Sequence, residues 1–269
     1  MKQFTQDEIC DFDEKGYIFV GQLITQETVE ELRNAIERVY QGEYNTGQKP
    51  DAIAWRPDHP DALAVRKIDN SWKADAFINA FVRNPQIGFL AAQLLRTDIV
   101  QVWHDQILHK PPNGGKVVTW HQDWNYWQLV TPANMVTCWI ALNDVAENSG
   151  PMEFLEGTHK MGLFERPPVI SGENAMEPKM PDGQRVRKVQ VTIPAGHATF
   201  HHCLTLHGSG RNFSAYPRRA FVIHIMDGHC RYRSGFRHST DHAWSLNDGD
   251  IFRGEQWPIL WQVTSSRET

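Results

Sequence analysis

The chain has 269 residues, with 27 lysines and arginines against 32 acidic residues and a formal net charge of −5. Hydrophobic residues make up 41% of it and charged residues 22%, so it can bury a large core, and this composition excludes intrinsic disorder. The mild negative charge argues against nonspecific binding to nucleic acid or to an anionic membrane, because both need a basic surface. Four scattered cysteines match neither a disulfide framework nor a zinc pattern. With a polar N-terminus and no apolar stretch of about 20 residues, a globular, cytoplasmic protein is expected.

The first hundred residues are predicted to form a helical layer. A threonine followed three residues later by glutamate is a capping box that begins a helix, and Thr5 and Glu8 form one. Apolar side chains at helical spacing predict a longer helix after Thr25, which Gly42 ends. The elements predicted here are a helix from Thr5 to about Gly16, a strand at 17–20, a helix from Thr25 to Gly42, a loop at about 41–60, and helices at 75–83 and 86–95.

From about residue 98 the pattern changes to short strands that are rich in β-branched and aromatic residues. Gly, Pro and Asn separate them, which is typical of a sandwich, barrel or jelly roll. Without an internal repeat or a linker, one domain over 1–269 is expected, with a helical layer over about 1–97, a β core over about 98–226 and an irregular C-terminal wrap over 227–269. A segment rich in Pro, Gly and charge predicts a mobile loop at 162–185. The predicted strands are 99–109, 135–142, 152–155, 186–193, 197–200 and 220–226.

The motif from Trp120 to Trp124 (Trp-His-Gln-Asp-Trp) carries the clearest chemical signal. Alternate residues of a strand point to the same face, so His121 and Asp123 can reach one metal ion. A third ligand, a histidine from a distant strand, would complete the two-histidine, one-carboxylate set of non-haem iron(II) oxygenases. An H-x-D pair also arises by chance, and a second one, His59-Pro60-Asp61, lies in a predicted loop where a ligand strand is not expected. The candidates for the third ligand are His197, His201, His202, His207, His224 and His229.

The residues after His207 distinguish it from the other candidates. A turn of small residues, Gly208-Ser209-Gly210, follows it, and Arg218 opens the next apolar strand. A histidine that ends one strand and an arginine that opens the next would lie side by side in an antiparallel core, where the arginine can bind a carboxylate with two hydrogen bonds. His201 and His202 are adjacent in a strand, so at most one of them faces inward, and both are predicted to be structural or to contact the metal ligands rather than the metal.

Four segments occur in a fixed order along the chain. They are Lys110-Pro-Pro with Trp120-His-Gln-Asp-Trp-Asn-Tyr-Trp, then Trp139-Ile-Ala-Leu-Asn-Asp, then Ser149-Gly-Pro-Met with Gly157-Thr-His-Lys, and finally His207-Gly-Ser-Gly with Pro-Arg218-Arg. Together they resemble the phytanoyl-CoA dioxygenase family of iron(II)- and 2-oxoglutarate-dependent oxygenases. The resemblance implies a mainly β fold with a double-stranded β-helix (jelly-roll) core and flanking helices. It also implies an enzyme that uses Fe(II), 2-oxoglutarate and O2 to hydroxylate a small molecule at an unactivated C–H bond, releasing succinate and CO2.

The resemblance also implies roles for single residues. His121, Asp123 and His207 match the iron ligands, and Arg218 matches the residue that binds the distal carboxylate of 2-oxoglutarate, with Arg219 as the alternative register. Asp123 argues for oxygenation, because iron halogenases of related fold lack this carboxylate. The positions that match the co-substrate pocket are Lys67, Gln106, Trp139 and Ser209, and Trp139 equally fits an ordinary core aromatic.

Substrate contacts are predicted around the ligand strand. Trp124, Tyr126 and Trp127 can form an aromatic wall above the iron or pack beneath the loop. His104 alternates with apolar residues of a strand and so can face inward. Because no extended basic patch would suit a coenzyme A pyrophosphate, a small amino-acid-like or aromatic metabolite is expected as the partner, without nucleic acid or membrane. A zinc-dependent hydrolase and a non-catalytic ligand-binding jelly roll remain as alternatives.

Overall fold

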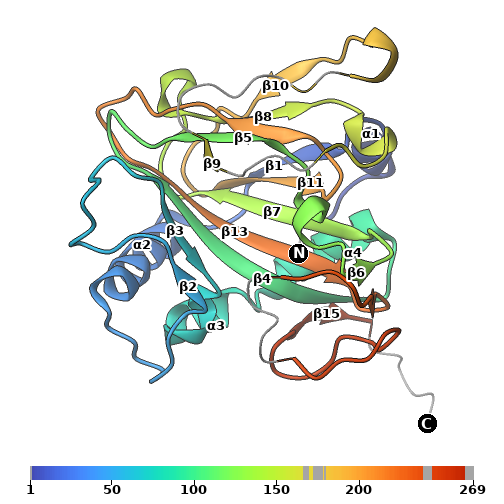
Figure 1. The fold of residues 1–269 in the computed structure, drawn as a ribbon, viewed down its shortest axis with the longest axis horizontal. Helices are drawn as coiled ribbons and strands as arrows, with labels where there is room; N and C mark the ends of the chain where they lie inside the picture. Colours follow the sequence, from blue (N-terminus) through green and yellow to red (C-terminus); the bar gives the residue numbers. More distant parts are fainter. Residues whose placement is uncertain (1, 166–169, 172–177, 179, 239–243, 264–269) are drawn as a thin grey trace.

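The structure is a computed structural model of the chain. It describes residues 2–165, 170–171, 178, 180–238 and 244–263. Figure 1 shows two antiparallel β-sheets, one above the other, with helices against the outer side of the larger sheet. Of the predicted mobile loop at 162–185, the parts at 166–169, 172–177 and 179 lie outside the described residues, so its mobility stays a prediction.

The helices lie in the first hundred residues, as the sequence predicts. They are α1 (Gln6–Lys15), α2 (Gln26–Gln41), α3 (Ala76–Phe81) and α4 (Pro85–Leu95). The capping box of α1 is present: the Thr5 hydroxyl accepts from the Glu8 amide, and the Glu8 carboxylate accepts from the Thr5 amide at 2.7 Å. Gly16 ends α1 with φ 80°, a conformation that glycine adopts without steric cost. No helix in the described part of the chain is long and apolar enough to cross a membrane.

Two sheets form the centre of the fold, and all of their neighbouring strands are antiparallel. In spatial order the larger sheet contains β1 (Tyr17–Gln22), β11 (His197–His202), β7 (Met135–Ala141), β13 (Arg218–Asp227), β4 (Ile99–Lys110), β3 (Arg66–Asp69) and β2 (Ala52–Ile53), and β15 (Ile259–Gln262) also pairs with β4. The smaller sheet contains β10 (Lys188–Gln190), β8 (Met152–Leu155), β12 (His207–Ser209), β5 (Val117–His121) and β9 (Ile170–Ser171), and β6 (Val130–Thr131) forms a ribbon with β14 (Arg231–Tyr232).

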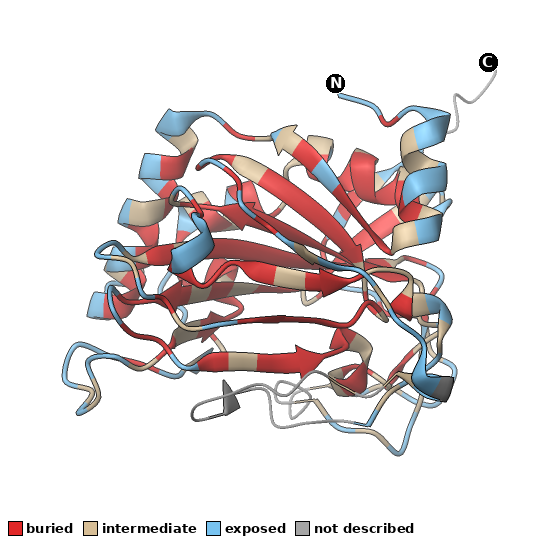
Figure 2. Ribbon diagram, turned by 90° about the horizontal axis from the view of Figure 1, so that it is seen from above, coloured by how far each residue is buried: buried red, intermediate tan, exposed pale blue. Residues whose placement is uncertain are grey.

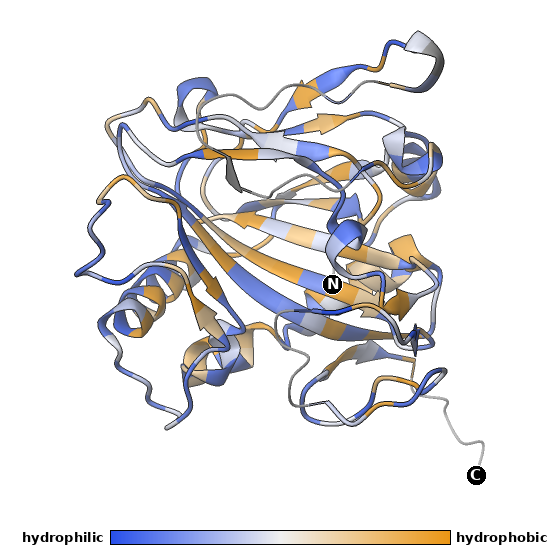
Figure 3. Ribbon diagram, in the orientation of Figure 1, coloured by the Kyte–Doolittle hydropathy of each residue, from blue (hydrophilic) through white to orange (hydrophobic). Residues whose placement is uncertain are grey.

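The side chains of β13 alternate between the two faces of the larger sheet. Phe221 and Ile223 point outward into the core that the helices cover, whereas Val222 faces the smaller sheet and packs in one cluster with Met152. Figure 2 shows this arrangement as buried strands flanked by helices with exposed outer faces, and Figure 3 shows hydrophobic and hydrophilic positions interleaved along the strands. The same alternation turns His224 inward, so polar side chains of the larger sheet gather in the space between the sheets.

The structure differs from the sequence predictions where strands are short. The predicted loop at 41–60 contains β2, which pairs with β3, so the N-terminal layer also extends the larger sheet. The strand predicted at 186–193 is limited to β10, and the C-terminal wrap contributes β14 and β15. These strands have two to four residues and carry no alternating pattern of their own, so contacts with neighbouring strands determine where they form.

Candidate active site

Two histidines and an aspartate converge between the sheets. His121 is the last residue of β5, and His207, the first residue of β12, is its cross-strand partner, with ring centroids 4.2 Å apart. The Oδ1 atom of Asp123 lies 3.6 Å from Nε2 of His121 and 3.5 Å from Nε2 of His207. One potential ligand atom from each of these buried residues lies within 4.8 Å of the other two. The set can therefore hold one metal ion and leave part of its coordination shell open.

The prediction that the H-x-D motif lies within one strand is wrong in detail. The strand ends at His121, and Asp123 begins a 3-10 helix, η2 (Asp123–Tyr126). Gln122 between them is still extended, with φ −110° and ψ 134°, so the alternation of side chains continues one residue beyond the sheet and Asp123 turns to the same side as His121. The Gln122 amide donates to backbone carbonyls of Gly162 and Leu204 at 2.8 and 2.7 Å, which holds the turn in place.

Backbone carbonyls orient both imidazole rings. Nδ1 of His121 lies 2.7 Å from the carbonyl of Thr119, and Nδ1 of His207 lies 2.9 Å from that of Thr205. A carbonyl only accepts, so each Nδ1 carries the hydrogen and each Nε2 keeps its lone pair toward Asp123. Burial, followed by the nearby His121, holds the pKa of His207 well below its ordinary value, so this ring is neutral and ready to bind a metal.

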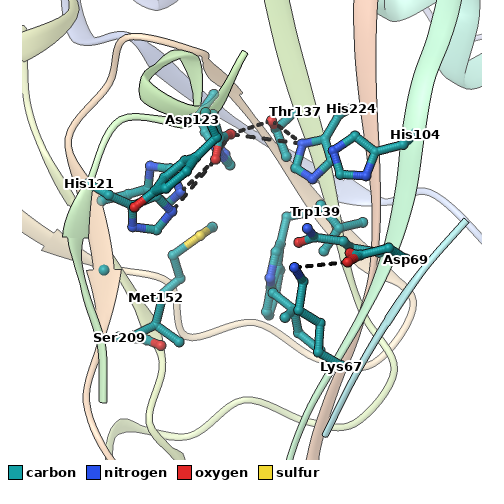
Figure 4. Close-up of a pocket in the computed structure, with 18 of the residues that line it drawn as sticks. Lys67, Asp69, His104, His121, Asp123, Thr137, Trp139, Met152, Ser209 and His224 are labelled. Atoms are coloured by element: carbon teal, nitrogen blue, oxygen red, sulfur yellow. Dashed lines mark hydrogen bonds and ion pairs between the residues drawn. The ribbon is translucent and has the colours of Figure 1, made fainter. Parts of the chain in front are cut away.

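The second carboxylate oxygen of Asp123 is held by the opposite sheet. The hydroxyl of Thr137, on β7, donates to Oδ2 at 2.7 Å (Figure 4). Nε2 of His201, on β11, donates to the same oxygen at 3.2 Å. Burial alone would raise the pKa of Asp123, but the hydrogen bond from His201 opposes this effect, and the pKa lies well below its usual range. Asp123 is therefore an ionised carboxylate whose Oδ1 faces the two histidines.

Two buried cations lie beside Ser209. Lys110 and Arg218 are cross-strand partners on β4 and β13, they are 1% and 2% exposed, and neither forms an ion pair with a described residue. Lys110 Nζ donates to Ser209 Oγ at 2.7 Å and to backbone carbonyls of Ser209 and Gly210. Arg218 donates through Nη2 to Gly150 O at 2.9 Å and to Ser209 Oγ at 3.2 Å, while its buried Nε has no hydrogen-bond partner.

This arrangement is suited to an anion. Burial lowers the pKa of Arg218 only to about 10, so the guanidinium stays charged at neutral pH. Because Lys110 and Arg218 are donors only, Ser209 Oγ accepts from both, which leaves its own proton to be donated. Burial and the nearby Arg218 hold the pKa of Lys110 well below its usual value, so its charged form needs an anion beside it. The guanidinium charge, the free Nε–H and the free hydroxyl proton together form a site for a carboxylate, since a buried charge without a counter-ion is costly.

The other candidate residues lie elsewhere or have other roles. Arg219 points away from Arg218 and does not line the cavity between the sheets. The prediction that His207 and Arg218 lie on neighbouring strands is wrong, because β12 and β13 belong to different sheets, and Ser209 makes the link to Arg218 instead. The other histidines considered as ligands take no part in the ligand cluster; they are His59, His197, His201, His202, His224 and His229. His59 contacts the Asp61 backbone, and His201 donates to Asp123 instead.

A cavity of about 280 Å³ joins the metal-ligand cluster to the cation site. Of the residues predicted for the pocket, those that line it are Lys67, His104, Gln106, Trp127, Trp139, Ser209 and Arg218. The Lys67 ammonium is held 3.0 Å from Asp69 Oδ2 on the same strand (Figure 4). The lining residues to which the sequence assigned no role include Lys110, Thr137 and Met152. The inward alternation of strands β4 and β7 was the signal that could have identified Lys110 and Thr137.

Trp124 is placed differently from Trp127. Its indole N–H donates to Val130 O at 2.9 Å, the Arg233 guanidinium lies 5.4 Å from its ring centre, and it is not among the cavity-lining residues. Tyr126 and Trp127 both line the cavity, and Trp127 follows η2 with φ −125° and ψ 26°, outside the helical conformation. A substrate contact by Trp124 stays a prediction, and the described geometry favours its two neighbours.

Comparison with known proteins gives a consistent result. The family model described as Phytanoyl-CoA dioxygenase (PhyH) matches residues 12–220. The peroxisomal phytanoyl-CoA dioxygenase of Bos taurus is 26% identical over 232 residues, which cover 82% of this chain and 68% of that enzyme. The solved structure of a non-heme alpha ketoglutarate dependent carbocyclase from nogalamycin biosynthesis has a TM-score of 0.74 at 24% identity, covering 96% of both chains. The epimerase SnoN in complex with Fe3+, alpha ketoglutarate and nogalamycin RO has a TM-score of 0.74 at 20% identity, covering 95% of this chain and 98% of that one.

The match to the family model covers most of the chain. The chain belongs to the phytanoyl-CoA dioxygenase family, and with it to the iron- and 2-oxoglutarate-dependent oxygenases. The predicted jelly-roll core is confirmed by the two facing antiparallel sheets and by the likeness to solved structures of this class.

Proposed function

We propose that the chain hydroxylates a small molecule, with His121, Asp123 and His207 holding Fe(II) and Arg218 binding 2-oxoglutarate. One observation carries the proposal: a set of metal ligands and a buried cation site without an anion border the same cavity. A dicarboxylate of the size of 2-oxoglutarate suits this pairing, since one end can reach the metal and the other the guanidinium.

The donor set fits iron(II). Two neutral imidazoles and one carboxylate are the facial set of non-haem iron oxygenases, and their burial excludes bulk water from one side of the metal. Bound iron and 2-oxoglutarate supply the activation of O2, with 2-oxoglutarate converted to succinate and CO2. The protein's contribution is to orient both rings through Thr119 and Thr205 and to hold Asp123 through Thr137.

The residues at the other end of the cavity would orient the co-substrate. Arg218 offers a planar pair of donors to the distal carboxylate, and Ser209 offers its hydroxyl proton. Lys110 holds Ser209 in the position to donate, and a bound carboxylate would stabilise the charged form of its amine. Trp139, whose ring centre lies 5.7 Å from the guanidinium carbon, forms one wall, and Lys67 and Gln106 line the path between the two ends.

The two alternative functions, a zinc-dependent hydrolase and a non-catalytic ligand-binding module, would use these residues differently. A zinc hydrolase needs the three metal ligands but has no use for the buried cation pair of Lys110 and Arg218. A ligand-binding module could use that pair but would not consume 2-oxoglutarate. The pair is costly to bury unless an anion occupies it during function, which favours an enzyme with a carboxylate co-substrate.

Turnover assays separate these functions. Succinate formed from 2-oxoglutarate is measured with Fe(II), with Zn(II) and without metal across a panel of small metabolites, while mass spectrometry follows the substrate. Hydroxylation predicts iron-dependent succinate and a product heavier by one oxygen atom. Product formation with Zn(II) alone would identify a hydrolase, binding without succinate would identify a binding module, and succinate with a product that gains no oxygen would contradict hydroxylation.

A further inference from the structure

A pair of histidines lines the wall of the cavity beyond the metal ligands. His104 on β4 and His224 on β13 are cross-strand partners, and their ring centroids lie 4.4 Å apart (Figure 4). Both residues are almost completely buried, at 2% and 4% exposure. Neither is needed to bind the metal or the co-substrate in the proposed function, on which this inference rests. Three of their four ring nitrogens are buried and have no hydrogen-bond partner.

The tautomer of His224 follows from its neighbours. The Thr137 hydroxyl has one proton and donates it to the Asp123 carboxylate at 2.7 Å. Its contact of 2.8 Å with Nδ1 of His224 must therefore be one in which His224 donates. Nε2 of His224 then carries a lone pair and can only accept a hydrogen bond.

His104 complements this acceptor. Burial, followed by the nearby His224, holds the pKa of His104 well below its ordinary value, so the ring is neutral. A neutral imidazole has one N–H and one lone pair, and both are without a partner here. The pair together therefore offers a donor on one ring and an acceptor on the other. Burying such groups without partners is unfavourable, so a ligand that supplies partners gains affinity.

We propose that His104 and His224 bind a hydroxyl group of the substrate, which makes the substrate an alcohol or phenol. A hydroxyl can donate to Nε2 of His224 and accept from the N–H of His104 at the same time. A carboxylate or an ether has no proton for His224, and an ammonium group has no lone pair for His104.

Aromatic side chains define the surroundings of this hydroxyl site. The ring of Trp127 lies 4.4 Å from that of His224 and 5.5 Å from that of His104, and the ring of His238 lies 5.3 Å from His104. These rings shield the nitrogen atoms of the pair, so the hydroxyl reaches them when one ring moves aside. A flat carbon ring attached to the hydroxyl would then pack against Trp127, which favours a cyclic alcohol or a phenol.

Binding of matched fragments tests the proposal without turnover. Phenol, anisole, benzoate and benzylammonium are titrated into the anaerobic enzyme loaded with Fe(II) and 2-oxoglutarate, and the dissociation constants are compared. We expect phenol to bind about tenfold more tightly than anisole, as one buried hydrogen bond allows, and more tightly than either ion. Equal binding of phenol and anisole would overturn the proposal.

Two variants and one control test whether the two histidines cause the preference for phenol over anisole. In His224→Phe and His104→Phe the preference for phenol over anisole should fall to about equal binding. His229→Phe removes a histidine that lies on the surface beside Asp98, and it should keep the preference. A preference that survives both cavity variants would overturn the proposal, and if His224→Phe does not fold, the parent and His104→Phe decide it. A separate titration of 2-oxoglutarate into the parent and the variants tests the proposed function. If 2-oxoglutarate does not bind, the dissociation constants of phenol and anisole can still be compared.

Discussion

Thr137 donates a hydrogen bond of 2.7 Å to the oxygen of Asp123 that faces away from His121 and His207. Asp123 follows a strand of the smaller sheet and Thr137 lies on the larger one, so this bond joins the two sheets at the metal-ligand cluster. It also fixes which carboxylate oxygen is available to a metal. The position of the ligand therefore depends on a residue that does not touch the metal.

The first prediction concerns this hydrogen bond. Thr137→Val keeps the shape of the side chain but removes the donor, and Asp123 loses one of two groups that orient it. Loss of such an outer partner typically weakens metal binding about 10- to 100-fold, which calorimetry with Fe(II) under anaerobic conditions would measure. Thr199→Val is the control, because its buried hydroxyl has no hydrogen-bond partner, and it should bind Fe(II) as the parent does. Equal affinity in both variants would contradict the role of Thr137.

The second prediction assigns the metal ligands. Asp123→Ala removes one of three protein ligands and should abolish most Fe(II) binding and all coupled turnover. The second H-x-D pair provides a matched control, since Asp61 lies in a loop and contacts His59 only through the backbone of the motif. Asp61→Ala should bind Fe(II) normally. If Asp123→Ala forms succinate and product at the parent rate, the assignment is wrong.

The third prediction concerns the cation site. Arg218→Ala should weaken 2-oxoglutarate binding by a hundred-fold to a few thousand-fold, because leaving a buried carboxylate unpaired costs about 3–5 kcal/mol. Arg218→Lys should recover only part of it, since a point charge cannot form two parallel hydrogen bonds. Titration of the co-substrate into each variant measures the effect. Arg219→Ala is the control, and an effect confined to it would show that Arg219 binds the carboxylate instead.

The fourth prediction separates the two tryptophans after the ligand motif. Trp127→Phe shortens a side chain that lines the cavity and should raise the KM of the substrate and the fraction of succinate formed without product. Trp124→Phe removes an indole that donates to Val130 O outside the cavity, so it should lower the melting temperature more than it changes coupling. Succinate and product measured together, beside thermal unfolding, distinguish the two. Parent coupling in Trp127→Phe would place the substrate elsewhere.

The fifth prediction is a pH dependence of stability. Burial, then Arg219 and Arg66, lower the pKa of His109 to about 3, against about 6.5 in an unfolded chain. Between these values the unfolded state binds a proton that the folded state does not, so His109 makes the free energy of unfolding fall as the pH falls below about 6.5. In His109→Gln the free energy of unfolding should therefore rise relative to the parent by about 1.4 kcal/mol per pH unit from pH 6 to pH 4. Urea unfolding of the metal-free proteins measures it, and parallel pH profiles would contradict it.

Much of the fold and of the chemistry of the site could be predicted from local patterns of residues. Caps at Thr5 and Thr25 and the spacing of apolar residues located the helices, because these signals act within a few residues along the chain. Segments rich in β-branched and aromatic residues, separated by Gly, Pro and Asn, located the long strands β4, β7 and β13. The order of the motifs around His121 and His207 indicated the family, which the match to the family model confirms.

How the site is completed depends on contacts between the two sheets. Thr137, His224 and Lys110 lie on strands of the larger sheet, whereas Asp123 follows a strand of the smaller one, and no local pattern marks a hydrogen bond between two sheets. The ends of short elements could not be predicted from the sequence either: β5 stops at His121, η2 ends at Tyr126, and of the two tryptophans Trp127 lines the cavity and Trp124 does not. Local preferences there are weak, so packing between the two sheets determines which side chains reach the cavity.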